Sequence, residues 1–179
     1  ATNNALPDCL VFDPGTRTFT GSPDENDIGS IQLQVVATDG TLNANESFML
    51  HVLAPGGIRI NAGGAQLAAY GVAFDEDKSS TGGATFANNS ISDIAGTVDD
   101  QLYRSERYGV FTYQVPVAPA EYVIRLHFAE IYFGATGGGA GGIGKRVFNV
   151  TGESVPLLTN FDITADAGAM VALIKEFHV

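Results

Sequence analysis

Carboxylates that could carry acid–base chemistry are scattered through the central part of the chain. A glycosidase needs two carboxylates placed on either side of the bond that it cleaves. Six residues offer such a group, and no motif selects a pair among them: Asp75, Glu76, Asp77, Asp99, Asp100 and Glu130. No nucleophile–base pattern accompanies them. The sequence therefore predicts a protein that is not an enzyme.

Two sets of residues are of types that bind metal ions, the histidines and a group of acidic residues near the N-terminus. The three histidines, His51, His127 and His178, lack the spacing of a zinc site. Four acidic residues in loop-like sequence near the N-terminus offer hard oxygen ligands of the kind that Ca²⁺ prefers: Asp24, Glu25, Asp27 and Asp39. Two interpretations stay open here, a Ca²⁺ site and a solvated acidic loop.

Charge and hydropathy exclude several classes of partner. The formal net charge is −11 with only 9 Lys and Arg residues, so the basic surface that binds nucleic acid is missing. No apolar stretch approaches the ~20 residues that span a bilayer. The chain starts at Ala1 without the basic segment of a signal peptide, which is expected of a mature or excised product of a longer precursor. These features favour an extracellular or cell-surface protein.

Short alternating segments separated by turn residues indicate an all-β fold. Expected strands cover 10–12, 18–20, 31–36, 47–53, 58–61, 110–115, 122–128, 146–150 and 170–179. Residues 65–107 are polar and read as loop-rich, with a break at 79–83. The glycine-rich segment 134–144 is expected to be a flexible rim or insertion; it lacks the Lys and strand–helix context of a phosphate-binding loop. Repeated short strands of this kind are typical of β-sandwiches and jelly rolls.

A change in pattern near residue 55 divides the chain. Residues 1–54 form one β-rich segment, 55–57 a short Pro/Gly linker and 58–179 a second, larger β-rich domain.

The first segment resembles the second half of a cadherin-like or Ig-like (dystroglycan-type) β-sandwich of bacterial surface proteins. The residues that carry the resemblance are Leu10-Val11-Phe12-Asp13, Arg17-Thr18-Phe19-Thr20-Gly21-Ser22-Pro23, Val36-Ala37-Thr38-Asp39-Gly40 and Phe48-Met49-Leu50-His51-Val52. The family usually has Trp where Cys9 stands. The resemblance implies that the first strands of this sandwich are missing.

The second segment resembles malectin domains, which are jelly-roll β-sandwiches. It carries Ile60-Asn61-Ala62-Gly63-Gly64, Ser105-Glu106-Arg107-Tyr108-Gly109, Leu126-His127-Phe128-Ala129-Glu130-Ile131-Tyr132-Phe133 and Lys145-Arg146-Val147-Phe148-Asn149-Val150, in family order. The family continues beyond Val179 with about two more strands and an acidic ligand-binding residue.

The malectin resemblance implies binding of glucose-containing oligosaccharides through aromatic side chains. Carried over position by position, the ligand contacts fall on Tyr108, Tyr132 and Phe133, and by spacing on Phe86, where the family usually has Tyr. Asn61, Gly63 and Gly64 are expected to shape a turn. Glu130 has two open roles, orienting sugar hydroxyls and pairing with Arg107.

Two functions compete at this point. The first is a non-catalytic, extracellular carbohydrate-binding module with an aromatic-walled pocket. The second is a structural module of a bacterial or archaeal surface protein or adhesive filament. Its sheet edges would then be completed by β-strands of neighbouring subunits, a form of self-association.

Overall fold

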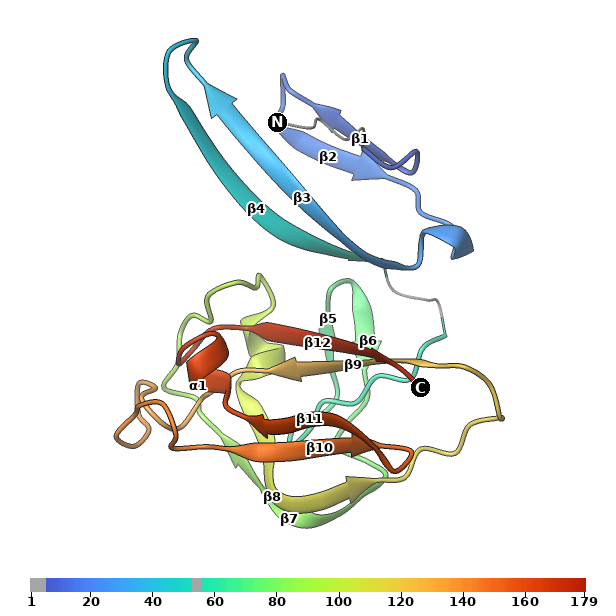
Figure 1. Ribbon diagram of the computed structural model, residues 1–179, viewed down its shortest axis with the longest axis vertical. Helices are drawn as coiled ribbons and strands as arrows, with labels where there is room; N and C mark the ends of the chain where they lie inside the picture. Colours follow the sequence, from blue (N-terminus) through green and yellow to red (C-terminus); the bar gives the residue numbers. More distant parts are fainter. Residues whose placement is uncertain (1–5, 53–55) are drawn as a thin grey trace. The chain divides into compact units, whose positions relative to one another are not determined.

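The computed structural model describes residues 6–52 and 56–179, and it is an all-β structure with one short α-helix (Figure 1). The chain divides into two compact units, Ala1–Gly57 and Ile58–Val179. The linker expected at 55–57 lies partly outside the described residues, because the description resumes only at Gly56. Every sheet formed by the described residues is an antiparallel pair of strands.

Unit 1 consists of two β-hairpins. Strands β1 (Leu10–Asp13) and β2 (Thr18–Gly21) pair around a turn in which Asp13 accepts the N–H of Gly15. A 3₁₀ turn, η1 (Glu25–Asp27), leads into the longer pair β3 (Gly29–Thr38) and β4 (Asn43–Val52). The expected turn at Asp39-Gly40 joins them, and the Asp39 carboxylate accepts the N–H groups of Thr41 and Leu42.

The core of unit 1 is small. Leu33 is buried, and three phenylalanine rings contact one another in sequence, Phe12 with Phe19 at 4.7 Å and Phe19 with Phe48 at 6.1 Å between centroids. Val36 and Leu42 remain exposed. Exposure does alternate along β3 as the sequence predicted, but Leu33 is the one buried side chain of the strand.

Unit 2 contains the remaining strands. A two-residue turn at Tyr70-Gly71 joins β5 (Leu67–Ala69) to β6 (Val72–Phe74), and both turn residues have positive φ, as a type I′ hairpin requires. The other elements are β7 (Ser80–Ala87), η2 (Asp100–Tyr103), β8 (Ser105–Tyr113), β9 (Val123–Phe128), β10 (Phe148–Gly152), β11 (Val155–Phe161), α1 (Ile163–Asp166) and β12 (Leu173–His178). The pairs are β7–β8, β9–β12 and β10–β11.

The expectation that residues 65–107 are loop-rich holds for most of this range but missed three strands. Strands β5, β6 and β7 lie in it, and residues 80–83 of the break expected at 79–83 belong to β7. Gly82 and Gly83 have φ values of +80° and +67°, and the register of the β7–β8 pair shifts between Gly82 and Ala84. The glycines thus form a bulge within a strand instead of ending it. Conversely, the strand expected at 58–61 is reduced to an isolated bridge between Ile60 and Asp75.

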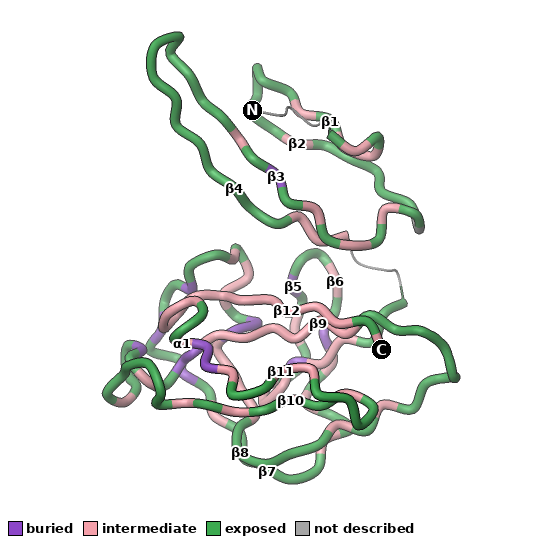
Figure 2. The backbone as a smooth tube through the Cα atoms, in the orientation of Figure 1, coloured by how far each residue is buried: buried purple, intermediate pink, exposed green. Residues whose placement is uncertain are grey.

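The main core lies in unit 2, where the fully buried stretches of the chain gather (Figure 2). It is built from Ala69, Phe74, Ile91, Ile94, Leu102, Tyr103, Ile131 and Ala135. Phe128 of β9 contacts Phe148 of β10 and Phe161 of β11, so aromatic rings join the two strand pairs. None of the helices in the described part of the chain is long and apolar enough to cross a membrane.

Candidate functional site

Phe86 and Tyr108 lie on one face of the β7–β8 pair. Phe86 is opposite Glu106, and Ala84 is opposite Tyr108. Residues directly opposite each other, and residues two apart on one strand, share a face of a sheet. Phe86, Glu106 and Tyr108 are therefore neighbours on a single surface, which forms the first wall of the candidate site. Tyr108 is 43% exposed.

The second wall is the Tyr132-Phe133 turn, which follows β9. The two rings meet edge to face at 5.0 Å between centroids, and Tyr132 meets Phe86 of the first wall edge to face at 5.5 Å. Tyr132 is 40% exposed and Phe133 is half-buried. Adjacent residues of a strand would point to opposite faces, but these two lie in a turn, and their rings therefore contact each other on the same side. The structure thus brings Phe86, Tyr132 and Phe133 into contact, with Tyr108 on the face that carries Phe86.

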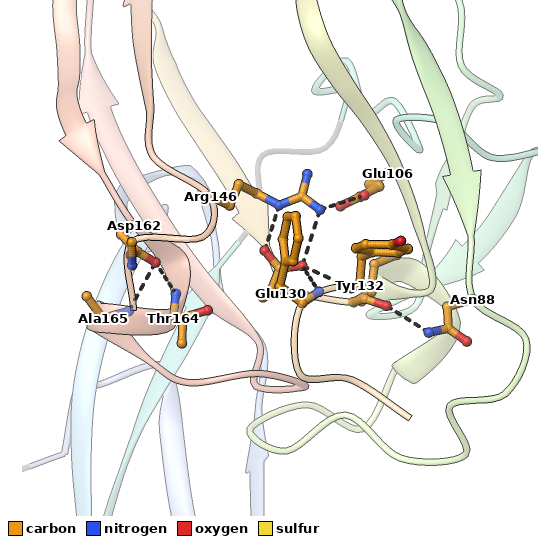
Figure 3. A network of polar contacts seen from close by, with 11 residues as sticks. Asn88, Glu106, Glu130, Tyr132, Arg146, Asp162, Thr164 and Ala165 are labelled. Atoms are coloured by element: carbon orange, nitrogen blue, oxygen red, sulfur yellow. Dashed lines mark hydrogen bonds and ion pairs between the residues drawn. The ribbon is translucent and has the colours of Figure 1, made fainter. Parts of the chain in front are cut away.

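A buried carboxylate shapes the second wall. Glu130 is fully buried, and its Oε1 accepts the backbone N–H groups of Tyr132 and Phe133, both at 2.9 Å. Its Oε2 accepts Arg146 Nε at 2.6 Å, and Arg146 Nη2 donates to Oε1 at 3.2 Å (Figure 3). Of the two roles left open for Glu130, pairing with Arg107 is not the one observed, because Arg107 lies on the other face of β8 and pairs with Asp77. As a fully buried group, Glu130 positions the turn.

Arg146 also reaches the first wall. Its Nη2 donates to Glu106 Oε1 at 3.1 Å, so that one guanidinium lies between two carboxylates (Figure 3). The same guanidinium lies over the Phe133 ring, 5.3 Å from its centroid. Burial raises the pKa of Glu106; Arg146 opposes this effect, and the charge of Glu130 adds to it. A guanidinium and two carboxylates thus join the two aromatic walls.

The glycine segment 134–144 is folded against Tyr132. Gly139 N–H donates to Tyr132 O and Gly134 N–H donates to Gly139 O, both at 2.8 Å. A side chain at Gly138 would overlap the carbonyl of Tyr132. Buried Asn88 adds support by donating to Ile131 O at 2.7 Å and to Thr136 O at 2.9 Å. Instead of an unattached rim, this segment forms a backbone support for the second wall.

The opposite face of β8 holds a second ion pair. Arg107 donates to Asp77 Oδ2 from Nε at 3.0 Å and from Nη2 at 2.7 Å, and Tyr113 Oη donates to Asp77 Oδ1 at 2.6 Å. Burial raises the pKa of Asp77, but the hydrogen bonds from Arg107 and Tyr113 outweigh it and leave the pKa below its ordinary value. This cluster anchors the segment before β7 to β8.

The turn expected around Asn61 is present. Asn61 is buried, donates from Nδ2 to Ala65 O at 2.7 Å and accepts from Ser105 Oγ at 3.0 Å. Its own carbonyl accepts the N–H of Gly64. Asn61 is occupied with turn formation and lies outside the contacts of the four aromatic residues.

The acidic loop residues considered for Ca²⁺ are used locally. Asp24 and Asp27 form a capping box around η1, and Asp39 holds the β3–β4 turn. The side chain of Glu25 lies outside what the structure describes. Within residues 6–52 and 56–179, no group of three or more His, Cys, Asp and Glu side chains is arranged to hold a metal ion.

One surface cavity lies away from the aromatic residues. Its volume is about 250 Å³, and it is lined by Ala68, Val98, Asp99, Asp100, Gln101, Leu102 and Arg104. None of the four predicted ligand contacts lines it. At the aromatic residues the structure shows two walls that meet where Phe86 contacts Tyr132.

Sequence reasoning missed two of the charged residues that join the walls, Arg146 and Glu106. Arg146 and Glu106 stood inside motifs that carried the malectin resemblance, yet neither was singled out. Their pairing joins positions 40 residues apart, and no local pattern encodes it. The one available signal was their presence as charged residues in strand-like sequence, since buried charges are rare unless paired.

Comparisons with known proteins agree with this architecture. Residues 57–179 match the family model of the malectin domain, and residues 1–53 match the model described as Putative Ig domain. A search of curated proteins finds no match. Among solved structures, a β-glucuronidase of Bacteroides uniformis is similar, with a TM-score of 0.52 and 13% identity. The match covers 90% of this chain and 20% of the β-glucuronidase, so it is a likeness of fold to part of a much longer protein.

Proposed function

The chain belongs to the malectin domain family, and on this basis we propose that it is a non-catalytic, extracellular module that binds glucose-containing oligosaccharides on the surface formed by Phe86, Tyr108, Tyr132 and Phe133. The family match implies a carbohydrate ligand. The finer parts of the proposal, namely the type of sugar, the four contact residues and the location outside the cell, rest on the arguments below.

The observation that carries the proposal is the convergence of the four aromatic residues. The Tyr132 ring contacts both Phe86 and Phe133, and the two most exposed residues, Tyr108 and Tyr132, still present 43% and 40% of their surface to solvent. Sugars bind proteins through aromatic rings that pack on their C–H faces, with a few polar groups that orient the hydroxyls. Tyrosine hydroxyls at the rim supply such polar groups.

A glycan array tests the proposal on the intact chain. We expect selective retention on oligosaccharides that contain glucose, with no signal on glycans that lack it. Retention that does not discriminate among sugars, or that persists when Tyr108 and Tyr132 are both changed to Ala, would argue against this surface. A Tyr122→Ala variant is the control. Tyr122 precedes β9 whereas Tyr132 follows it, so this variant removes an exposed tyrosine outside the proposed site and should bind as the wild type does.

A second candidate is a structural role in which strands of neighbouring subunits complete the sheets. Two-stranded sheets support it, because each pair leaves strand edges without a partner among the described residues. The β3–β4 pair is the longest, with 10 residues in each strand. Light scattering over a concentration series should then show growing assemblies, whereas a monomer at every concentration would remove this candidate.

A further inference from the structure

One guanidinium connects both walls of the candidate site. Arg146 donates to Glu130, which holds the backbone of Tyr132 and Phe133, and also to Glu106, which stands opposite Phe86 on the first wall. No other ion pair among the described residues joins these two elements. Among the described residues Arg146 is therefore the charged link between the walls, beside the Phe86–Tyr132 ring contact and the hydrogen bonds from Asn88 to Ile131 O and Thr136 O.

This network is poorly explained by stability alone. It places a guanidinium and two carboxylates where the side chains of Arg146, Glu106 and Glu130 are 19%, 16% and 0% exposed. Desolvating such groups costs free energy that their mutual attraction often only offsets, and well-packed apolar residues frequently serve stability as well or better. Some buried charge networks instead impose a single geometry, and here the network joins the Tyr132-Phe133 turn to the strand that carries Glu106 and Tyr108.

The shape of the arginine side chain suits this task. Its Nε and Nη2 bind the two oxygens of Glu130 while Nη2 also binds Glu106, and the planar group lies over the Phe133 ring. A lysine ammonium at the same place would carry the charge but not the planar fork, so it could not fix both carboxylates and the ring at once.

We propose that Arg146 is a positioning residue for carbohydrate binding, one that holds the Tyr132-Phe133 turn against the Phe86–Tyr108 wall. The inference rests on the proposed function, since it names what keeps that same surface in its binding geometry. A binding surface that already has its bound geometry in the free protein loses less conformational entropy when the ligand binds.

The test compares Arg146→Lys with a matched Arg125→Lys control. Arg125 donates from Nε to Glu176 Oε2 at 2.7 Å across β9 and β12, in a pair whose side chains are 14% and 27% exposed. Both variants keep the positive charge and remove the guanidinium of a partly buried arginine that donates to glutamate, to Glu130 and Glu106 in one variant and to Glu176 in the control. Titration with maltose should show affinity reduced at least about tenfold for Arg146→Lys and changed by less than about twofold for Arg125→Lys. Equal effects of the two variants, or none for Arg146→Lys, would overturn the proposal.

A ligand-free readout separates this inference from the proposed function. The amide hydrogens of Tyr132 and Phe133 are held by Glu130, so their exchange with solvent should accelerate about tenfold or more in Arg146→Lys and stay unchanged in Arg125→Lys. If the wild-type chain binds no maltose, the proposed function fails, but the exchange rates still decide whether Arg146 positions the turn. Unchanged exchange at both amides contradicts the positioning role whatever the sugar result.

A Glu106→Gln variant isolates the link to the first wall. It leaves the Glu130–Arg146 pair intact, so the exchange of the Tyr132 and Phe133 amides should match that of the wild type. The affinity for maltose should still fall, by about threefold or more, because the second wall is no longer tied to the first by an ion pair. An affinity equal to that of the wild type would reject the link between the walls.

Discussion

Tyr108 is the side chain on which the proposed sugar contact depends most directly, since it is the most exposed of the four aromatic residues. We expect Tyr108→Ala to weaken binding of a glucose disaccharide by about tenfold or more, as is usual for an aromatic anchor in a binding surface. Thermal unfolding should be almost unaffected, because little buried surface is lost. Calorimetric titration and circular dichroism measure the two effects, with Tyr122→Ala as the control; a large drop in stability would make Tyr108 a structural residue instead.

Glu106 should make sugar affinity and stability respond to acid in opposite directions. Its pKa is raised by burial and by the charge of Glu130, against the opposing effect of Arg146. A carboxyl group with a raised pKa binds its proton more tightly in the folded state, so its contribution to stability is present at low pH and is lost as the pH rises through the folded pKa. Protonation also weakens the ion pair with Arg146 that joins the walls.

The affinity for maltose should accordingly fall as the pH is lowered through the pKa of Glu106. Titrations over a pH series measure this, and the same series on Glu106→Gln provides the control, because that variant has no group to titrate at this position. A pH dependence that survives in Glu106→Gln would assign the effect to another residue.

Asp77 shows the reverse behaviour. Its net pKa shift is downward, so its contribution to stability is present above the pKa of the unfolded chain and is lost as the pH falls through the folded pKa. Asp77→Asn should lower the free energy of unfolding at neutral pH, because it removes the carboxylate that pairs with Arg107 and accepts a hydrogen bond from Tyr113. Denaturant unfolding at several pH values measures the loss, and the gap between variant and wild type should close in acid; a gap of constant size would contradict the assignment.

Among the elements, the glycine segment 134–144 shows no strand pattern in its sequence, yet in the structure its backbone supports Tyr132. Gly138→Ala should displace the segment, since the added methyl group would overlap the Tyr132 carbonyl. Gly142→Ala is the matched control: its methyl group meets no atom within 4 Å, although φ at this position is +129°. Maltose affinity should fall in Gly138→Ala and stay near the wild-type value in Gly142→Ala. Equal affinities in the two variants would show that the segment does not support Tyr132.

Strands with clear alternation could be predicted, and the strand interrupted by two adjacent glycines, β7, could not. The alternation in 31–36 and 122–128 located β3 and β9, because a period of two is visible wherever one face is buried. Strand β7 escaped prediction because Gly82 and Gly83 have the local signature of a turn. They form a bulge instead of a turn because β8 pairs with β7 on both sides of them, and the local sequence does not predict such long-range pairing.

The sequence singled out aromatic residues that the structure brings close together, and it did not predict the ion pairs beside them. The family motifs placed Tyr108, Tyr132 and Phe133, and spacing placed Phe86. Arg107 was one of two interpretations for Glu130, as its ion-pair partner, but alternation along β8 turns Arg107 to the other face, towards Asp77. Which of several arginines reaches a buried carboxylate depends on how the strands cross in space, and spacing along the chain does not determine that.

At the level of the whole molecule, burial is uneven between the two units. Leu33 is the one buried hydrophobic residue in the described part of unit 1, whereas unit 2 holds a contiguous buried cluster. We therefore expect amide hydrogens of β3 and β4 to exchange with solvent faster than those of β9 and β12, because opening a thin core costs less free energy. Hydrogen exchange with mass spectrometry measures this; slower exchange in β3–β4 would point to protection by a partner strand and favour the self-association candidate.

The central claim is that carbohydrate binds where the two aromatic walls meet, and a nuclear magnetic resonance titration of the intact, isotope-labelled chain with maltose tests it most directly. The account predicts saturable shift changes that centre on Phe86, Tyr108, Tyr132 and Phe133. Residues around the separate cavity, such as Ala68 and Gln101, should stay unchanged. Shift changes centred on that cavity, or none at millimolar maltose in a folded sample, would contradict it.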